Sequence, residues 1–105
     1  MVSKLKFEEK VYSVCKEIPK GKVSTYKEVG RVLNSKAYRA IGQALRKNPY
    51  KYVPCHRVIG SSGKIGGFRG NEVEEKEKLL KEEGVEVVNG KVNLSKFSHR
   101  LKFQQ

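Results

Sequence analysis

The chain has 105 residues, of which 37% are hydrophobic and 32% are charged, and its formal net charge is +12. This length predicts a single domain over residues 1–105 and leaves no room for a separate cofactor domain of the doubly wound type. No run of about 18 apolar residues occurs, and Met1–Lys10 holds no apolar stretch of signal-peptide length, so we expect neither a membrane span nor secretion. The two cysteines, Cys15 and Cys55, are therefore expected to be free thiols in a reducing compartment.

An N-terminal helix is predicted from Lys6 to Ile18. Its apolar residues recur at steps of three and four, which is typical of one helix face. They are Phe7, Val11, Val14, Cys15 and Ile18. Because Cys15 belongs to that face, we expect it to be a buried core thiol. The helix is expected to end at Pro19-Lys20-Gly21.

Two short helices joined by a tight turn are predicted next. Thr25 is expected to cap the first, with Glu28 three residues later completing a capping box, and this helix would stop near Asn34. Ser35 is expected to cap the second, from Lys36 to about Lys47. Such a pair with a basic second helix is a candidate DNA-binding helix-turn-helix, and the alternative is plain helix packing.

The middle of the second predicted helix is unusually small. It contains Ala40, Gly42 and Ala44, and its inward face is expected to comprise Ala37 or Ala40 together with Ile41, Ala44 and Leu45. Gly42 costs about 1 kcal/mol of helix propensity relative to alanine. Close packing of helices would explain the glycine, and so would close approach to a nucleic-acid groove.

Loops are predicted to dominate the segment after these helices. Asn48-Pro49 breaks the second helix, and Tyr50–Val53 is short and β-prone. The stretch Gly60–Gly70 contains five glycines, which predicts a loop whose backbone can lie flat against a ligand. It lacks the Gly-Lys-Ser/Thr ending of a phosphate loop, so nucleoside triphosphate binding is unsupported.

A charged helix from Glu72 to Glu83 and a hairpin are predicted to follow. Strands at Val85–Val88 and Lys91–Leu94 flank Asn89-Gly90, a strong hairpin signal, and a hairpin after a helix-turn-helix resembles a wing. Residues 95–105 are expected to form a basic, loosely held tail. The predicted fold class is mainly α with a small β-hairpin, similar to a winged helix-turn-helix domain.

The charges are segregated along the chain. Lys and Arg total 23 against 11 Asp and Glu, yet no acidic residue occurs from Val29 to Asn71, and seven acids lie between Glu72 and Glu86. A cationic block with the acids on one flank indicates a face that binds nucleic-acid phosphates. The alternative is a generally cationic protein rich in Lys and Glu. A membrane surface is a weaker partner, because no segment combines a strongly apolar face with a basic one.

Pro54-Cys55-His56-Arg57-Val58 is the segment most suggestive of chemistry. A cysteine reacts as its thiolate, which nearby positive charge and hydrogen bonds favour. The adjacency of Cys55 and His56 is weak evidence by itself, because successive side chains of an extended segment point to opposite faces. The residues alone leave a reactive and an inert Cys55 equally open. The two cysteines and two histidines of the chain are not spaced as the ligands of a metal site usually are, so we expect no metal site.

With this motif the sequence resembles the catalytic DNA-binding domain of O6-alkylguanine-DNA alkyltransferases. The resemblance covers roughly Phe7 to Gly84. The Pro-Cys-His-Arg-Val motif is highly specific to that family, and five further motifs occur in the family's order. These are Gly21–Tyr26, Ala37–Ala44, Asn48-Pro49, Ser61–Gly63 and Leu79–Gly84.

The resemblance implies a transfer mechanism that needs no cofactor. Cys55 would attack the alkyl carbon on O6 of a damaged guanine, and His56 would take the thiol proton through a water. Glu83 would orient the imidazole, Asn48 would hold the turn that presents the cysteine, and Tyr26 would donate a proton to the leaving guanine. The alternatives are a solvated helix face for Glu83 and a half-buried capping neighbour for Tyr26. The thioether product makes the protein a single-turnover transferase.

The resemblance also implies double-stranded DNA containing O6-alkylguanine as the partner. The target atom is inaccessible inside a duplex, so the nucleotide must be flipped out, and Arg39 would fill the gap from a helix in the minor groove. The alternative for Arg39 is one more phosphate contact. The other DNA-contacting candidates are Tyr26, Lys36, Ala40, Gly42 and Arg46, and the base pocket would comprise Val58, Ser61, Ser62, Gly63 and Phe68. We expect a monomer, located in the cytoplasm with the nucleoid or in the nucleus.

Three features depart from full-length transferases. We expect no N-terminal domain before the catalytic one. The step from Asn48 to Cys55 is seven residues and looks one shorter than usual, and Phe68-Arg69 replaces an aromatic-Ser pair. These features are similar to those of alkyltransferase-like proteins, which bind alkylated DNA and flag it for excision repair but usually lack the cysteine. A lesion sensor that recruits excision-repair proteins is therefore the alternative function, and a winged-helix DNA-binding regulator is the second alternative.

Overall fold

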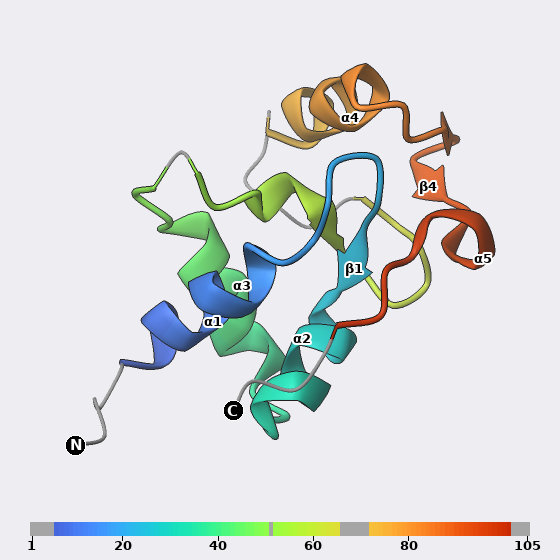
Figure 1. The fold of residues 1–105 in the computed structure, drawn as a ribbon. Helices are drawn as coiled ribbons and strands as arrows, with labels where there is room; N and C mark the ends of the chain where they lie inside the picture. The colour runs from blue at the N-terminus through green and yellow to red at the C-terminus, as the bar shows by residue number, and fades with distance from the viewer. Residues whose placement is uncertain (1–5, 51, 66–71, 102–105) are drawn as a thin grey trace.

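The computed structural model describes residues 6–50, 52–65 and 72–101 (Figure 1). In chain order its elements are α1 (Phe7–Cys15), β1 (Ser24–Thr25), α2 (Tyr26–Leu33), α3 (Tyr38–Arg46), the 3-10 helix η1 (Cys55–Arg57), β2 (Val58–Ile59), α4 (Glu72–Glu82), β3 (Val87–Val88), β4 (Lys91–Val92) and α5 (Leu94–Phe97). The described part of the chain is mainly helical with a small hairpin, which confirms the predicted fold class. It contains no helix long and apolar enough to cross a membrane.

The first three helices pack around one apolar cluster. It combines the inward faces of α1, α2 and α3 with Val53 and Val58. Cys15 is fully buried in this cluster, and burial raises the pKa of its thiol to about 12. The predicted core thiol is therefore confirmed. The helix itself ends at Cys15, earlier than predicted, although Ile18 remains buried.

The predicted helix-turn-helix is present as α2 and α3. The Thr25 hydroxyl accepts a hydrogen bond from the Glu28 amide at 3.0 Å, which confirms the N-cap. The predicted capping box is otherwise wrong. The Glu28 carboxylate does not accept from the Thr25 amide but binds Arg31 and the Leu101 amide. Asn34 ends α2 in the left-handed conformation with φ 55°. The second helix is shorter than predicted, beginning at Tyr38 after the Ser35 hydroxyl accepts from the Ala37 amide.

Gly30 allows the two helices of this motif to approach. A Cβ at this position would lie 2.5 Å from the Ser35 carbonyl oxygen and 2.6 Å from the Tyr38 ring. Any side chain at position 30 would therefore displace the turn or the start of α3.

Two strand pairs complete the fold: β1 and β2 are parallel, and β3 and β4 are antiparallel. In the β1–β2 pair, Ser24 lies opposite Val58 and Thr25 opposite Ile59, while β3 and β4 form the predicted hairpin. Asn89 and Gly90 both have positive φ, as a two-residue type I′ turn requires. Both strands are shorter than predicted: β3 begins at Val87, and β4 ends at Val92 because α5 begins at Leu94.

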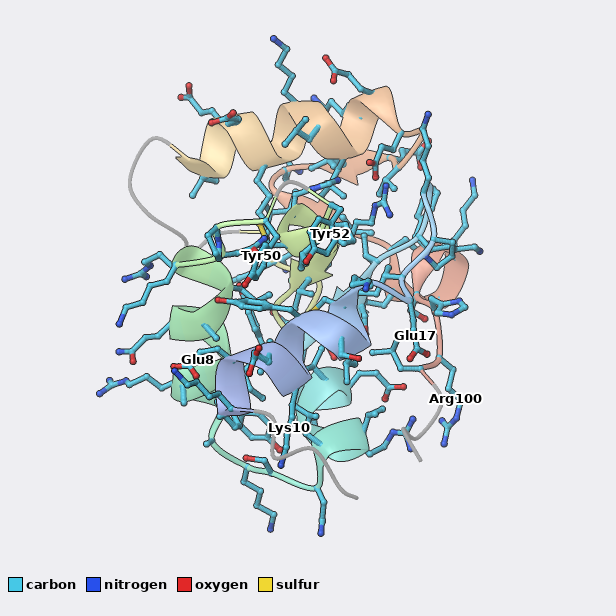
Figure 2. All side chains as sticks on the ribbon, turned by 60° about the vertical axis from the view of Figure 1, so that its left-hand side comes forward. Glu8, Lys10, Glu17, Tyr50, Tyr52 and Arg100 are labelled. Atoms are coloured by element: carbon cyan, nitrogen blue, oxygen red, sulfur yellow. The ribbon has the colours of Figure 1, made fainter. Side chains whose placement is uncertain are left out.

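The β-prone segment Tyr50–Val53 is not a strand. Within its described residues the chain turns, and the rings of Tyr50 and Tyr52 pack together at 5.2 Å between centroids (Figure 2). Tyr50 also meets the Tyr12 ring of α1 edge-on at 5.7 Å. Aromatic packing on α1 thus replaces the strand pairing that local β propensity favours.

The segment after α4 is held firmly as far as Leu101, so the expectation of a loose tail is wrong for its described part. Phe97 and Leu101 are 9% and 2% exposed. The amide of Val23 donates to the Phe97 carbonyl, and that of His99 donates to the Val23 carbonyl. Arg31 binds the Leu101 carbonyl at 2.8 Å, so the Glu28–Arg31 pair ties this segment to α2. These long-range partners have no local sequence signal.

Candidate active site and nucleic-acid interface

Cys55 lies in a tight turn between α3 and β2. The Arg57 amide donates to the Pro54 carbonyl at 3.0 Å, which closes one 3-10 turn through Cys55 and His56. The segment is therefore not extended, and the objection that adjacent side chains must face opposite sides does not apply. Cys55 is half-buried and packs against the first core cluster. Cys15 is buried, whereas Cys55 is partly accessible to solvent.

Asn48 fixes the loop that presents Cys55. Its side-chain amide donates to the Val53 carbonyl at 3.1 Å, and its side-chain oxygen accepts from the Tyr50 amide at 2.9 Å. The same Val53 carbonyl accepts from the Cys55 amide at 2.9 Å. One asparagine thus closes the loop before Cys55 and holds the carbonyl that anchors the cysteine backbone.

His56, Arg57 and Glu83 form a buried ionic cluster. His56 Nε2 lies 2.9 Å from Glu83 Oε2, and Arg57 binds both carboxylate oxygens at 2.9 and 2.7 Å. The three side chains are 13–18% exposed. Arg57 also donates to the Ile18 carbonyl at 2.8 Å, which fixes the guanidinium against the end of the α1 region. The alternative of a solvated helix face for Glu83 is therefore wrong, and its carboxylate lies within hydrogen-bonding distance of the imidazole.

The charge state of Glu83 determines the tautomer of His56. Burial alone raises the pKa of Glu83, but the hydrogen bonds and charges of Arg57 and His56 outweigh it and bring the pKa to about 2. An ionised carboxylate only accepts hydrogen bonds, so Nε2 of His56 must carry the proton that it donates. In the neutral imidazole Nδ1 is then the basic nitrogen, ready to accept a proton.

The end of α4 places Glu83 in this cluster. The amide of Gly84 donates to the Lys81 carbonyl and that of Val85 to the Leu80 carbonyl, which is a Schellman motif with Gly84 at φ 90°. Glu83 is therefore the capping residue of a helix that contacts η1 (Figure 1). The glycine at position 84 fixes where the helix ends and hence where the carboxylate lies.

Tyr26 lies beside the cysteine because β1 pairs with β2. Tyr26 directly follows β1, and Cys55 lies three residues before β2, so the parallel pairing brings them together against one core cluster. Burial raises the pKa of Tyr26, and the charge of a Cys55 thiolate acts in the same direction. The phenol thus stays protonated at neutral pH, as a proton donor must.

The outward face of α3 carries exposed cations. Arg39 and Arg46 are exposed seven residues apart on the side opposite the buried Ile41, Ala44 and Leu45, and Lys36 is exposed just before the helix. Ala40 and Gly42 are half-buried. A Cβ at Gly42 would meet only the Tyr26 ring, at 3.9 Å, which is ordinary contact. Packing within the described residues therefore does not require glycine at position 42.

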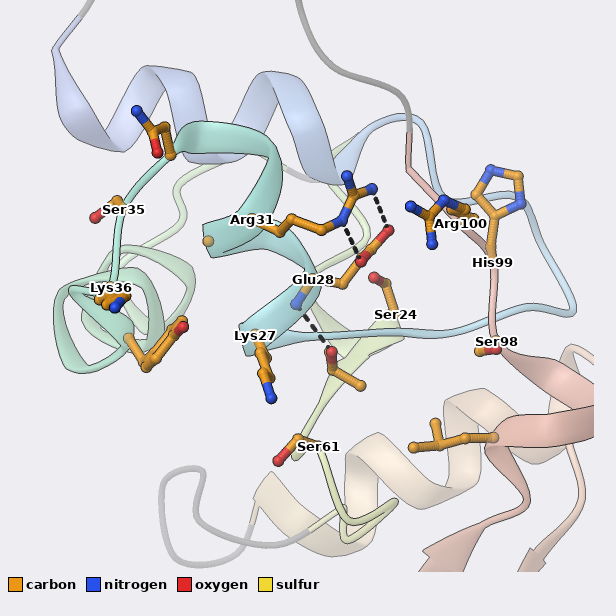
Figure 3. A pocket seen from close by; sticks show the side chains of 15 residues that line it. Ser24, Lys27, Glu28, Arg31, Ser35, Lys36, Ser61, Ser98, His99 and Arg100 are labelled. Atoms are coloured by element: carbon orange, nitrogen blue, oxygen red, sulfur yellow. Dashed lines mark hydrogen bonds and ion pairs between the residues drawn. The ribbon is translucent and has the colours of Figure 1, made fainter.

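A basic groove of about 1100 Å³ runs beside this face (Figure 3). It lies between α2, the start of α3 and the C-terminal segment, and Ser61 forms part of its wall. Its lining cations and histidine are Lys27, Arg31, Lys36, His99 and Arg100. Neither Cys55 nor the His56–Arg57–Glu83 cluster lines this groove.

The predicted base pocket is only partly in place among the described residues. Ser61 and Ser62 are exposed, whereas Val58 is fully buried and is paired with Ser24 across the two strands. Gly63 has φ 89°, and its carbonyl accepts from the Val92 amide at 2.9 Å, which fixes this loop on the hairpin. Phe68 lies outside the described residues.

Sequence reasoning missed the ionic role of Arg57 and the burial of Lys76. Arg57 was visible within the Pro-Cys-His-Arg-Val motif, but its bonds to Glu83 depend on a contact across 26 positions. Lys76 is 3% exposed. Its spacing from Val73 and Leu80, three and four residues, placed it on the apolar face of α4 and was the available signal. The described residues contain no cluster of three or more metal-ligating side chains.

The fold and site thus define a small helix-turn-helix domain that carries a half-exposed cysteine beside a histidine–glutamate pair. Residues 6–85 match the family model described as 6-O-methylguanine DNA methyltransferase, DNA binding domain, and the chain belongs to this family. DNA repair, methyl transfer and DNA binding are the activities that the family defines.

Individual relatives agree with this assignment. The chain is 46% identical to a methylated-DNA–protein-cysteine methyltransferase of Methanosarcina acetivorans over 80 residues, which cover 74% of this chain and 51% of that protein. It is 45% identical to alkyltransferase-like protein 1 of Schizosaccharomyces pombe over 84 residues, covering 77% and 78%. A crystal structure of S. pombe Atl1 with damaged DNA containing O6-carboxymethylguanine matches with a TM-score of 0.81 and 38% identity, covering 89% and 94% of the two chains. The chain spans about half the length of the methyltransferases that it matches.

Proposed function

We propose that this protein transfers an alkyl group from O6 of guanine in duplex DNA to Cys55, once per molecule. The observation that carries the proposal is the placement of a half-buried Cys55 beside His56, whose imidazole is bound to Glu83 at 2.9 Å. A cysteine with only a structural role would be expected in the position of Cys15, sealed in the core.

The reaction balances without a cofactor. His56 accepts the thiol proton through a water, using the basic Nδ1 that the Glu83 bond leaves available. The thiolate forms the S–C bond as the C–O6 bond breaks, and the electron pair of that bond passes to the guanine. Tyr26 donates a proton to the purine and regains one from solvent, while His56 releases the thiol proton to solvent, so the thiol hydrogen is in effect exchanged for the alkyl group.

The DNA interface is proposed to be the exposed face of α3. Arg39 would fill the gap left by the flipped nucleotide, while Lys36 and Arg46 would contact phosphates. Ala40 and Gly42 would let the helix approach the minor groove. The formal charge of +12 predicts that affinity falls steeply with added salt.

Intact mass after incubation with an O6-methylguanine duplex tests the proposal. The wild type should gain about 14 Da, one methylene, at one group per molecule. Cys55→Ala should gain nothing, and Cys15→Ala, the matched control at the buried thiol, should gain as much as the wild type. An unmodified wild-type protein would refute the transfer.

Gly42→Ala should separate stability from DNA binding. The methyl group has space inside the chain, so the free energy of unfolding should rise by up to about 1 kcal/mol from helix propensity. The same methyl group would face the DNA, so affinity for a lesion duplex should fall by about tenfold. Urea unfolding and a fluorescence binding titration measure the two effects, and unchanged affinity would exclude close groove approach at position 42.

A lesion sensor is the second candidate. It is favoured by the near-complete match to S. pombe Atl1, which covers 94% of that chain and was crystallised with damaged DNA. In this case the protein would bind the lesion duplex more tightly than undamaged DNA and its mass would not change, and excision-repair proteins would act next. Equal affinity for damaged and undamaged duplex would leave only a DNA-binding regulator.

A further inference from the structure

The basic groove beside α2 extends the cationic surface beyond α3. Its volume of about 1100 Å³ exceeds the usual range of about 300–1,000 Å³ for small-molecule pockets. Among the described residues that line it, the one carboxylate belongs to Glu28, which is already paired with Arg31 at 2.8 Å. The permanently charged cations of the lining are Lys27, Arg31, Lys36 and Arg100. The groove therefore carries a net positive charge that its own residues do not neutralise.

The outer wall of the groove is formed by residues 97–101, which are fixed at two points. At the first point, the backbone of Val23 makes hydrogen bonds of 2.9 and 2.8 Å with this segment. At the second, the amide and carbonyl of Leu101 bind the carboxylate and guanidinium side chains of α2 at 2.9 and 2.8 Å. Arg100 lies between these points. Its backbone is thus ordered in advance, which lowers the entropy lost when its side chain binds a ligand.

The charge of Arg100 is directed toward the groove. Hydrogen bonds from Arg31 lower the pKa of Glu28, and the charge of Arg100 acts in the same direction. Arg100 is nevertheless exposed and lines the open space (Figure 3). Its guanidinium is therefore available to an anion in the groove.

The floor of the groove holds a buried hydroxyl whose hydrogen bonding is incomplete. Ser24 is 1% exposed, and its Oγ has no hydrogen-bond partner among the described residues. Figure 3 shows Ser24 between α2 and the C-terminal segment. Buried polar groups in folded proteins almost always have a partner. An unpartnered hydroxyl that lines a groove therefore indicates a polar occupant.

The chemistry of the lining favours a phosphodiester backbone over a peptide. Lysine, arginine and small hydroxyl side chains are the groups that contact nucleic-acid phosphates. Besides its cations, the groove is lined by the hydroxyl residues Ser24, Thr25, Ser35, Ser61 and Ser98. Protein interfaces instead centre on buried aromatic or aliphatic anchors, and the described lining offers only Leu94 and the ring of Tyr38 for that purpose.

The groove is continuous with the proposed DNA interface. Lys36, proposed above as a phosphate contact, lines the groove at the start of α3. Ser61, which follows β2 and belongs to the predicted base pocket, lines it as well. A DNA strand that contacts Lys36 would therefore continue into the groove.

We propose that this groove binds the phosphodiester backbone of duplex DNA beside the lesion, with Lys27 on one wall and Arg100 on the other. The C-terminal segment is then a second DNA-contacting element in addition to α3. The inference rests on the proposed function for its DNA substrate. It concerns only the backbone, however, and is tested on undamaged duplex.

The test is the affinity of the double variant Lys27→Gln/Arg100→Gln for an undamaged fluorescent duplex at several salt concentrations. Both residues are exposed, so the fold should not change. Loss of two phosphate contacts should lower the affinity about tenfold and reduce the slope of log affinity against log salt concentration by about two. The matched control Lys10→Gln/Lys78→Gln removes the same charge from exposed positions of α1 and α4 outside the groove, and should leave the slope unchanged.

Equal slopes in the wild type and the groove variant, or an equal change in the control, would overturn the proposal. Unchanged DNA affinity together with lost binding of a polyglutamate peptide would also overturn it, since that result is expected of a docking site for an acidic protein. Transfer is measured separately. A protein that binds undamaged duplex through this groove but takes no methyl group from a lesion duplex would refute the proposed alkyl transfer and leave the groove assignment intact.

Discussion

Glu83→Gln is expected to lower the free energy of unfolding by about 3 kcal/mol at neutral pH and to slow alkyl transfer by on the order of a hundredfold. The carboxylate binds Arg57 through both oxygens and His56 through one, and all three side chains are largely buried. A glutamine leaves the guanidinium without its counter-charge and removes the acceptor that fixes the imidazole. Urea unfolding and single-turnover kinetics measure the two losses.

The effect of Glu83→Gln on the free energy of unfolding should depend on pH. The pKa of Glu83 is about 2 in the folded protein, below its ordinary value of 4.5, so the ionised group stabilises the fold fully above pH 4.5. That contribution is lost as the pH falls from 4.5 toward 2. The stabilities of the wild type and Glu83→Gln should therefore converge over this window, whereas exposed Glu82→Gln should follow the wild type throughout. Parallel curves for the wild type and Glu83→Gln would contradict the ionic cluster.

Arg39→Ala is expected to slow lesion processing by on the order of a hundredfold, while affinity for undamaged duplex falls less than tenfold. Arg39 is exposed on the outer face of α3, and filling the gap in the base stack offsets an unstacking cost of a few kcal/mol. If Arg39 contacted only phosphate, its loss would weaken both activities alike. It would also reduce the slope of log affinity against log salt concentration by about one.

Arg46→Ala is the matched control for this prediction, because Arg46 is exposed on the same helix and proposed as a phosphate contact. We expect its effects on damaged and undamaged DNA to be similar. Competition binding and single-turnover transfer at several salt concentrations separate the cases, and equal losses in Arg39→Ala would reduce that residue to a phosphate contact.

The sequence predicted those parts of the structure that short-range chemistry controls. The Thr25 cap, the glycine-containing turn at Asn89-Gly90 and the apolar face that buries Cys15 each depend on residues within a few positions. Helix ends were less accurate. The cap of α3 falls at Ala37 instead of Ser35, because Ser35 stabilises the turn through the Ala37 amide.

Long-range partners were beyond sequence reasoning from the residues alone. Glu28 bonds to Leu101 across 73 positions and thereby orders a segment that composition describes only as basic. Arg57 engages Glu83 across 26 positions. The burial of Lys76, which is 3% exposed, likewise depends on what packs against α4. In each case the pairing of elements decides which side chains meet.

The account depends most on which sulfur receives the alkyl group. The direct measurement is peptide mass mapping after incubation with a duplex whose O6-methyl group carries three deuteriums, titrated from substoichiometric to excess DNA. We predict one labelled methyl group per protein, entirely on the peptide that contains Cys55, with saturation at equimolar lesion. Label on Cys15, label on no cysteine, or continued turnover beyond one lesion per molecule would contradict it.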